Sequence, residues 1–375
     1  MPTGPFGELL MAVLLIDGLV GGLCLLILFV RNILCRWPEV PLRLGEDETR
    51  SVSGGQSLLA AVRAEGFLLP GSCGGRGTCG ICRVRVMRGG GEPAPSEELL
   101  VSPADLRSGV RLACQVRVRC EIEAELPEDA RAARFVRSEV VSCKKISSDI
   151  YRLLLRPREP SGWRFAAGQY IQVFRERPQP GDEPLTRAYS LASDPATPET
   201  LELHVRRVPE GELSPWLCER NEGDEFWFSG PYGAMTLPKT GPETEIVCVA
   251  GGVGFAPMKA IVLEMAGRSN PSRTWLFAGA ATPEALYDHA WAVGMARKHP
   301  WLIYVPCAQE CPVPANGEAG MFERGLVTEA LERRFPSERT AVALLCGPER
   351  MVAASRMILA AKGIPPARLL ADTFS

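Results

Sequence analysis

The sequence predicts a multidomain chain of α+β and α/β domains that follows an N-terminal transmembrane helix. Three observations support this: a long apolar segment at the start, two runs of short alternating strands, and a final third in which apolar strands alternate with helices. The chain has 375 residues, enough for two or three domains, and 46% of them are hydrophobic, enough for real cores. A net charge of −2 gives no reason to expect nucleic-acid binding.

The first element is the apolar segment at residues 9–30, which contains one charged residue, Asp17. As a helix this segment is about 33 Å long, which is enough to cross a bilayer. Arg31 and Arg36 follow it and no Lys or Arg precedes it, so the positive-inside rule places the rest of the chain in the cytoplasm. A cleaved signal peptide is the alternative, but it would need a basic start and a shorter apolar core. We expect residues 1–37 to be a retained anchor.

Asp17 is an ionisable residue inside the expected span. A carboxyl group at that depth is costly when it faces lipid, so it is expected to face another helix or a water-filled site. Partner membrane subunits are one interpretation, and a protonated Asp on a lone anchor is the other.

Residues 38–128 are predicted to form short strands around one helix. GGQSLLAAVRAEG has helical apolar spacing and ends at Gly66, whereas CRVRVMR and LACQVRVRCEIEAELP alternate as strands do. A small mixed sheet crossed by one helix is the β-grasp pattern.

This domain contains the most informative motif of the chain, a set of four cysteines with the spacing C-x5-C-x2-C and a distant fourth: Cys73, Cys79, Cys82 and Cys114. Three thiolates in a glycine-rich loop with a distant fourth are typical ligands of a [2Fe–2S] cluster. Glycines are expected to turn the loop amides towards sulfur through positive φ angles, at Gly74, Gly75, Gly77 and Gly80.

Zinc and disulfides are the alternatives for these cysteines. A zinc site usually has two Cys-x2-Cys pairs, and only Cys79 and Cys82 form one here. Disulfides need an oxidising compartment, whereas the other nine cysteines are scattered singly, as in proteins of a reducing compartment.

After a charged linker at 129–137, residues 138–241 are predicted to form an antiparallel β-barrel that binds FAD. The segment Arg187-Ala188-Tyr189-Ser190 offers a phosphate clamp, an aromatic ring for stacking and a hydroxyl for a flavin nitrogen. Two further segments are expected at the cofactor: His204-Val205-Arg206 and the helix start Gly211-Glu212-Leu213-Ser214, which suits a pyrophosphate. Each segment alone is equally well explained as ordinary strand structure, but the three in order are not.

Residues 242–375 are predicted to form a doubly wound α/β domain that binds NADH. A strand, a glycine turn and a helix start follow one another, with Gly251, Gly252, Val253, Gly254, Ala256 and Pro257 as candidate contacts to a dinucleotide. The turn is not the GxGxxG fingerprint, so this is not a standard Rossmann motif. Cys346-Gly347-Pro348 lies at the carboxyl end of a late strand, where its thiol suits a nicotinamide ring; a buried structural cysteine is the alternative.

The residues after the strand TWLFAG favour NADH over NADPH. The segment AATPE carries no Arg or Lys to hold a 2′-phosphate, and Glu284 would repel one.

From Arg187 onward the chain resembles the ferredoxin–NADP+ reductase superfamily, through RAYS, GELSPWL, AGGVGFAPM and CGPERM. With the apolar helix and the cysteine loop in front, it is similar over nearly its whole length to the F subunits of Na+-translocating NADH:quinone oxidoreductases. The resemblance implies electron flow from NADH through FAD to the cluster. It also implies Ser190, Cys346 and Phe374 as catalytic residues, with Cys346 and Phe374 shaping the nicotinamide pocket and Phe374 covering the flavin ring. The implied location is the inner membrane of a bacterium, as a single-pass protein with cytoplasmic catalytic domains and other integral membrane subunits as partners.

Two departures from that family are visible. Only FRERPQPGDEPLT separates the strand GQYIQV from RAYS, where the family has a sizeable insertion, and TWLFAGAATPEALY lacks the family's basic residue. The compact arrangement also resembles soluble reductases of bacterial aromatic monooxygenases. The alternative function is therefore an anchored NADH-dependent reductase that supplies an oxygenase or another acceptor. A non-enzymatic redox sensor is a third interpretation, which the intact nucleotide motifs oppose.

Overall fold

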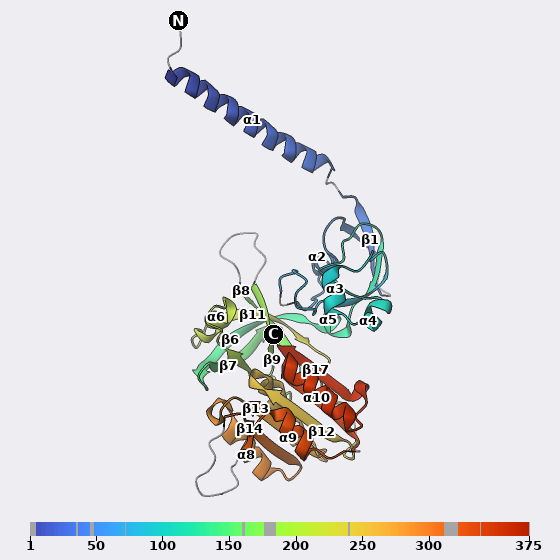
Figure 1. Cartoon of the computed structure of the whole chain (residues 1–375), viewed down its shortest axis with the longest axis vertical. Helices are drawn as coiled ribbons and strands as arrows, with labels where there is room; N and C mark the ends of the chain where they lie inside the picture. Colours follow the sequence, from blue (N-terminus) through green and yellow to red (C-terminus); the bar gives the residue numbers. More distant parts are fainter. Residues whose placement is uncertain are drawn as a thin grey trace. The chain divides into compact units, whose positions relative to one another are not determined.

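The computed structural model describes residues 5–34, 37–45, 49–71, 73–159, 162–175, 185–238, 241–310, 322–337 and 339–374. The chain divides into two compact units: residues 1–65 with 83–126, and residues 66–82 with 127–375. Three sheets follow one another along the chain, a small mixed sheet, an antiparallel sheet and a parallel sheet (Figure 1). This is the predicted order of domain types.

The first unit contains a five-stranded sheet with the order β2-β1-β5-β3-β4. Its strands are β1 (Glu39–Leu44), β2 (Arg50–Ser53), β3 (Arg83–Arg88), β4 (Val110–Leu112) and β5 (Ile122–Glu125). β1 pairs with β5 in parallel and with β2 antiparallel, and the buried residues alternate along β1. Helix α2 (Leu58–Ala64) begins where the Ser57 hydroxyl accepts a hydrogen bond from the Ala60 amide. The predicted mixed sheet is confirmed, and α2 is the predicted helix, but the unit also contains two short helices that were not predicted.

A buried ion pair fixes the segment that leads to Cys114. Between β3 and β4 lie the short helices α3 (Pro95–Leu100) and α4 (Pro103–Arg107). Glu97 in α3 is fully buried and pairs with Arg111 at 2.8 Å, and its other oxygen accepts a hydrogen bond from the Leu112 amide. Burial opposes ionisation, but the Arg111 guanidinium and the Ala94 and Leu112 amides lower the pKa of Glu97.

The antiparallel sheet of the second unit has the order β10-β7-β6-β11-β8-β9. Its strands are β6 (Arg134–Lys145), β7 (Ile150–Glu159), β8 (Tyr170–Arg175), β9 (Leu185–Ser190), β10 (Leu201–Arg206) and β11 (Glu225–Tyr232), and α6 (Leu213–Cys218) lies between the last two. The segment predicted as a linker, 129–137, is instead mostly regular structure. It contains most of α5 (Glu128–Ala132) and the start of β6, and the Asp129 carboxylate accepts a hydrogen bond from the Gly233 amide at 3.0 Å.

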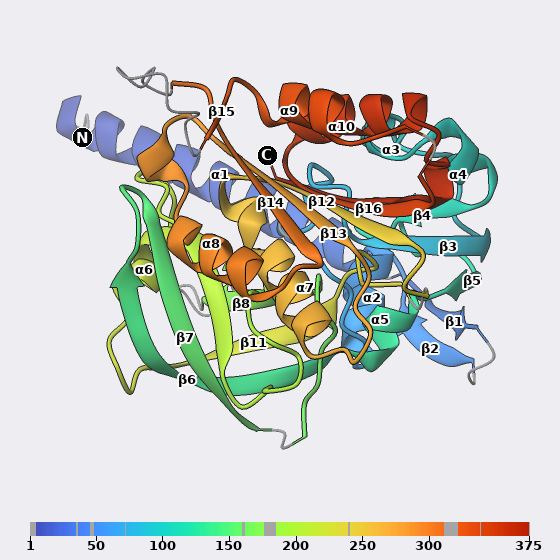
Figure 2. The same ribbon diagram turned by 90° about the horizontal axis from the view of Figure 1, so that it is seen from below.

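The parallel sheet has the order β15-β14-β13-β12-β16-β17. Its strands are β12 (Glu245–Gly251), β13 (Thr274–Ala280), β14 (Leu302–Ala308), β15 (Glu323–Arg324), β16 (Ala341–Pro348) and β17 (Leu369–Phe374). Helices α7 (Phe255–Ala266) and α8 (His289–Lys298) pack on one face, and α9 (Val327–Arg334) and α10 (Glu349–Ala361) pack on the other (Figure 2). This is the predicted doubly wound arrangement.

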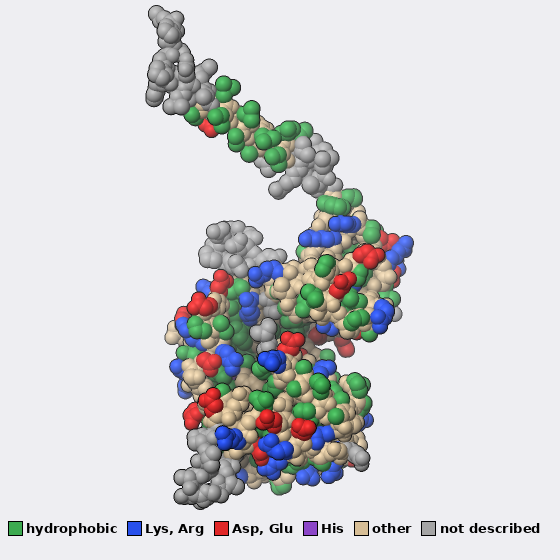
Figure 3. Space-filling model, viewed as in Figure 1, with side chains coloured by type: hydrophobic (Ala, Val, Ile, Leu, Met, Phe, Trp, Pro, Cys, Tyr) green, Lys and Arg blue, Asp and Glu red, His purple; other side chains and the backbone are tan. Residues whose placement is uncertain are grey.

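The apolar N-terminal segment forms α1 (Pro5–Leu34). Its described side chains, those of residues 13–27 and 29, are all exposed, and apolar groups cover this part of the helix (Figure 3). Among the described residues, no helix combines the length and the apolar character that a membrane crossing requires. The transmembrane span predicted from the sequence is thus not confirmed.

Candidate functional site

The cysteine loop surrounds the sulfur of Cys73 with donors. The Sγ atoms of Cys73 and Cys79 lie 3.4 Å apart, and Cys73 is buried. Burial opposes ionisation, but the loop amides of Thr78, Cys79 and Gly77 together with the Cys79 thiol lower the pKa of Cys73 to about 7. An anionic cluster needs such donors around its sulfurs, so this loop fits the group.

The glycines of the loop adopt the backbone conformation predicted for them. The φ angles are 62°, 80°, 74° and 67° at Gly74, Gly75, Gly77 and Gly80, in that order. These are left-handed values that side chains with a Cβ rarely adopt, so they explain why the loop is rich in glycine.

The four cysteines do not all belong to one unit. Cys82 is buried at the end of the loop in the second unit, whereas Cys114 is buried in the first unit, in the turn after β4. The Gln115 side chain donates to the Cys114 sulfur at 3.4 Å. A common cluster on all four cysteines stays a prediction.

Strand β9 carries the segment predicted to bind flavin, and the cysteine loop is bound to it. Thr186 donates from its hydroxyl to the Gly71 carbonyl at 2.9 Å, and both residues lie in the second unit. Arg187, the next residue, is exposed, while Ser190 is 9% exposed and pairs with Tyr170 of β8. The structure thus places the loop beside the strand that bears the predicted phosphate clamp and hydroxyl.

The aromatic side chains near this strand are neutral. Burial is the main cause that raises the pKa of Tyr189, with a smaller contribution from Cys218. Burial also raises the pKa of Tyr170, with a smaller contribution from Asp372. The Tyr170 ring lies 5.7 Å from that of Tyr232. Tyr170 pairs with Ser190 across β8 and β9, and flat aromatic rings beside this strand suit stacking on a flavin, so the residues fit FAD.

The other two predicted flavin segments differ from the expectation in detail. The Ser214 hydroxyl accepts a hydrogen bond from the Val208 amide at 3.1 Å, so it braces the turn before α6. The His204 side chain is fully buried and bonded to Glu202 and Tyr287, and Val205 is 1% exposed in the core. Arg206 is exposed and pairs with Asp149 at 3.1 Å, and its contact with a cofactor stays a prediction. Gly211 and Glu212 precede α6 and Leu213 is its first residue, and the contact of these three residues with FAD stays a prediction.

The glycine turn after β12 packs closely against the end of β16. A Cβ on Gly254 would lie 2.1 Å from the Cys346 carbonyl oxygen, and one on Gly252 would lie 2.7 Å from the Arg206 guanidinium. Gly252 also has a φ of 55°. The turn therefore offers bare backbone beside a cation, which fits a dinucleotide pyrophosphate. Val253 is partly exposed, whereas Ala256 and Pro257 are buried at the start of α7.

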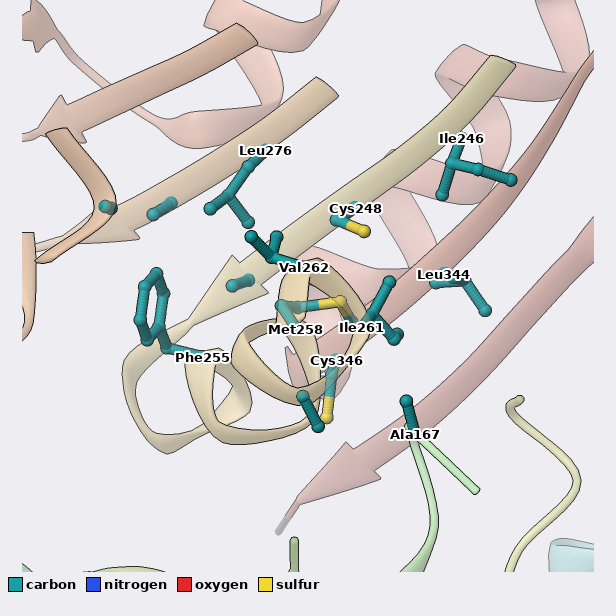
Figure 4. Packing of buried hydrophobic residues seen from close by; sticks show 14 of the residues in the cluster. Ala167, Ile246, Cys248, Phe255, Met258, Ile261, Val262, Leu276, Leu344 and Cys346 are labelled. Atoms are coloured by element: carbon teal, nitrogen blue, oxygen red, sulfur yellow. The ribbon is translucent and has the colours of Figure 1, made fainter. Parts of the chain in front are cut away.

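Cys346 lies in the core between α7 and Ala167 (Figure 4). Its exposure is 0%, and burial followed by the charge of Asp372 raises the pKa of the thiol well above its usual range. A neutral, packed thiol agrees with the structural alternative, and a role at the nicotinamide stays a prediction. Gly347 and Pro348 end β16 opposite Thr373 and Phe374 of β17; the Phe374 side chain lies outside the described residues.

A buried charged network that the sequence analysis missed joins the antiparallel sheet to the parallel-sheet domain. Lys259 of α7 lies 2.8 Å from Glu202 of β10 and 2.8 Å from Asp288, and Arg152 of β7 pairs with both carboxylates. Asp288 has a positive φ of 56°, rare for a residue with a side chain. The available signal was a lone lysine in the apolar helix FAPMKAIVLEMA, because a buried ammonium requires partners.

Three ligand-type side chains of this network, Glu202, His204 and Asp288, converge as metal ligands do. However, the Lys259 ammonium already bridges the two carboxylates at 2.8 Å each. The carboxylates therefore have their cation, and the cluster is an ion-pair network.

Three family models match successive parts of the chain. A 2Fe-2S iron-sulfur cluster binding domain matches residues 43–119, an oxidoreductase FAD-binding domain matches 137–237, and an oxidoreductase NAD-binding domain matches 248–357. Fold and site together define an NADH-dependent flavin and iron–sulfur oxidoreductase.

Relatives match almost the whole chain. The F subunit of the Na(+)-translocating NADH-quinone reductase of Neisseria meningitidis is 28% identical, and the match covers 98% of this chain and 99% of that one. The crystal structure of the Amycolatopsis cytochrome P450 reductase GcoB is 30% identical, with a TM-score of 0.70, and covers 89% of this chain and 98% of that one. A ferredoxin reductase in carbazole 1,9a-dioxygenase shares the fold at 24% identity and a TM-score of 0.63. The chain belongs to the ferredoxin–NADP+ reductase superfamily, in its group with an N-terminal 2Fe–2S domain.

Proposed function

We propose that this protein is the NADH-oxidising subunit of a membrane-bound, Na+-translocating NADH:quinone reductase. The observation that carries the proposal is the match to the Neisseria protein over 98% of this chain, which includes the apolar N-terminal part that precedes all three domains. When bound, FAD would accept a hydride from NADH, and a cluster on the predicted cysteines would carry single electrons onward.

The protein's own residues position these groups. The turn at Gly251–Gly254 with Arg206 receives the pyrophosphate of NADH, and Arg187, Tyr189 and Ser190 hold FAD. The cysteine loop, tied to β9 through Thr186, brings three of the four predicted cluster ligands to the flavin strand, Cys73, Cys79 and Cys82.

We further propose that α1 anchors the protein in the inner membrane of a bacterium, with the catalytic domains in the cytoplasm. Large apolar side chains of α1 are exposed, for example Leu15 at 68% and Leu19 at 73%, and an apolar environment would remove this surface from water. In this proposal Asp17 faces a helix of another membrane subunit.

A specific observation favours a second function, that of an electron donor to an oxygenase. The P450 reductase structure is the relative with 30% identity, and the chain covers 98% of it. The short segment before RAYS agrees with this compact type of reductase. An anchored reductase for an oxygenase or another cytoplasmic acceptor therefore remains the alternative.

Co-purification distinguishes the two functions. The full chain would be isolated from its own membranes in mild detergent, with quinone reduction by NADH as the assay. Several multi-helix subunits in fixed ratio, with Na+-stimulated quinone reduction, are expected. Isolation of the chain alone or with an oxygenase would contradict the quinone-reductase proposal.

The structure also predicts a preference for NADH over NADPH at Glu284. Glu284 is exposed, and its own backbone amide and Thr282 lower its pKa, so it is ionised at neutral pH. We expect Glu284→Gln to raise kcat/KM for NADPH relative to NADH about two- to fivefold, the size of an exposed charge interaction. Steady-state kinetics with both nucleotides would measure the ratio, with exposed Glu199→Gln as the control. An unchanged ratio would contradict the assignment.

A further inference from the structure

The two ring nitrogens of His204 have different partners. Nε2 lies 2.7 Å from a Glu202 carboxylate oxygen, and Nδ1 lies 3.2 Å from the Tyr287 hydroxyl. Burial alone would raise the pKa of Glu202. The hydrogen bond from His204 and the Lys259 ammonium outweigh this effect and lower the pKa of Glu202 to about 2. An ionised carboxylate only accepts hydrogen bonds, so Nε2 of His204 carries a hydrogen.

The Tyr287 hydroxyl has one hydrogen and two acceptors within reach. One is Nδ1 of neutral His204 at 3.2 Å, and the other is the Gly252 carbonyl oxygen at 3.3 Å. Burial raises the pKa of Tyr287 well above its usual range, so the hydroxyl keeps its hydrogen. The hydrogen cannot serve both acceptors fully at the same time.

Protonation of His204 decides between the two acceptors. In the neutral ring Nδ1 is an acceptor and takes the Tyr287 hydrogen. In the protonated ring Nδ1 donates to the Tyr287 oxygen, and the Tyr287 hydrogen is then available for Gly252.

The groups that face His204 come from several elements. They are Glu202 from its own strand, Arg152 from β7, Lys259 from α7, and Tyr287 and Asp288 from the segment before α8. Burial lowers the pKa of His204 below its ordinary value of 6.5, against the opposing effect of Glu202. The neutral ring therefore dominates at pH 7, and the protonated ring forms only as the pH falls below that ordinary value.

We propose that Tyr287 is a positioning residue for the dinucleotide turn, and that the protonation state of His204 controls whether its hydroxyl holds the Gly252 carbonyl. Gly252 lies in the turn at a left-handed φ of 55°, next to Arg206, and glycine has many other accessible conformations, so a fixed carbonyl keeps the turn in one of them. The inference rests on the proposed NADH site. One hydrogen bond gained by the turn is expected to tighten dinucleotide binding about three- to tenfold in acid.

The test measures the Kd of ADP-ribose for the full FAD-loaded chain by calorimetry between pH 5 and pH 8. ADP-ribose carries the pyrophosphate but lacks the nicotinamide. Burial raises the pKa of Asp372 to about 6, so Asp372 titrates in the same pH range, and a ligand without the nicotinamide avoids its influence on that part of the site. The wild type is expected to bind about three- to tenfold more tightly once His204 is protonated, with the pH at which the ring protonates read from its nitrogen NMR signals. Equal affinity before and after His204 becomes protonated would overturn the coupling, and no binding at any pH would overturn the NADH site as well.

Two variants give opposite expectations. His204→Phe leaves Gly252 as the acceptor for Tyr287, while Glu202 keeps Arg152 and Lys259, so its affinity should match that of the acid wild type at every pH. Tyr287→Phe should match the weaker, alkaline wild type at every pH. If both variants weaken binding equally and keep the pH slope, the role is only structural and the proposal fails.

A measurement on the wild type tests the proposal even if both variants fail to fold. Nitrogen NMR of the His204 ring at pH 8 should show the hydrogen on Nε2 and a bare Nδ1. A hydrogen on Nδ1 at pH 8 would overturn the proposal without any variant.

Discussion

Replacing Cys79 by alanine is expected to abolish the iron–sulfur centre while hydride transfer from NADH to FAD continues. The Cys79 sulfur lies 3.4 Å from that of Cys73, in the loop whose amides face the Cys73 sulfur. Removal of one ligand should cost more than removal of an outer-shell partner, which already costs about 10–100-fold. We therefore expect NADH-driven reduction of cytochrome c to fall by more than about 100-fold.

Three measurements separate loss of the cluster from loss of the fold. Iron content and the electron paramagnetic resonance signal of the reduced protein report the cluster, and anaerobic bleaching of FAD by NADH reports the flavin site. The matched control is Cys120→Ala, an exposed cysteine outside the motif, which should keep both activities. A Cys79→Ala protein with full iron content would show that the loop does not bind the cluster.

Replacing Lys259 by methionine is expected to lower the free energy of unfolding of the second unit by about 3 kcal/mol, because loss of one partner leaves buried charges uncompensated. Lys259, Glu202 and Asp288 have side-chain exposures of 8%, 15% and 8%. Arg152 still pairs with both carboxylates, so the effect should lie at the lower end of the range for buried pairs.

The cost of Lys259→Met should depend on pH. The folded pKa of Glu202 is about 2, below its ordinary 4.5, so the carboxylate stabilises the fold above pH 4.5 and this contribution is lost as the pH falls towards 2. Without the ammonium the folded pKa rises, so the variant should differ most from wild type at neutral pH and least in strong acid.

Urea unfolding followed by flavin fluorescence measures this difference. The control is Lys298→Met, an exposed lysine at the end of α8, for which a change within about 0.5 kcal/mol is expected. Equal free energies of unfolding for Lys259→Met and wild type at pH 7 would show that the network does not stabilise the fold.

Much of the fold could be predicted because it follows from local patterns. Alternating strands predicted the mixed and antiparallel sheets, and continuous apolar runs predicted the parallel strands. The linker at 129–137 was predicted from its charge alone, and this was wrong in part. Its structure depends on a contact from Asp129 to Gly233, about a hundred residues away, which no local pattern contains.

The sequence by itself determined the cysteine loop and the dinucleotide turn. In both, the chemistry depends on backbone conformation, and glycine at a given position is a local property: positive φ occurs at Gly74, Gly75, Gly77, Gly80 and Gly252. Only the tertiary structure decided that Cys346 is packed in the core, that the Ser214 hydroxyl accepts a hydrogen bond from the turn before α6, and that His204 faces Tyr287. These outcomes depend on side chains from distant elements, and a buried charge such as Lys259 is stable only where folding brings its partners to it.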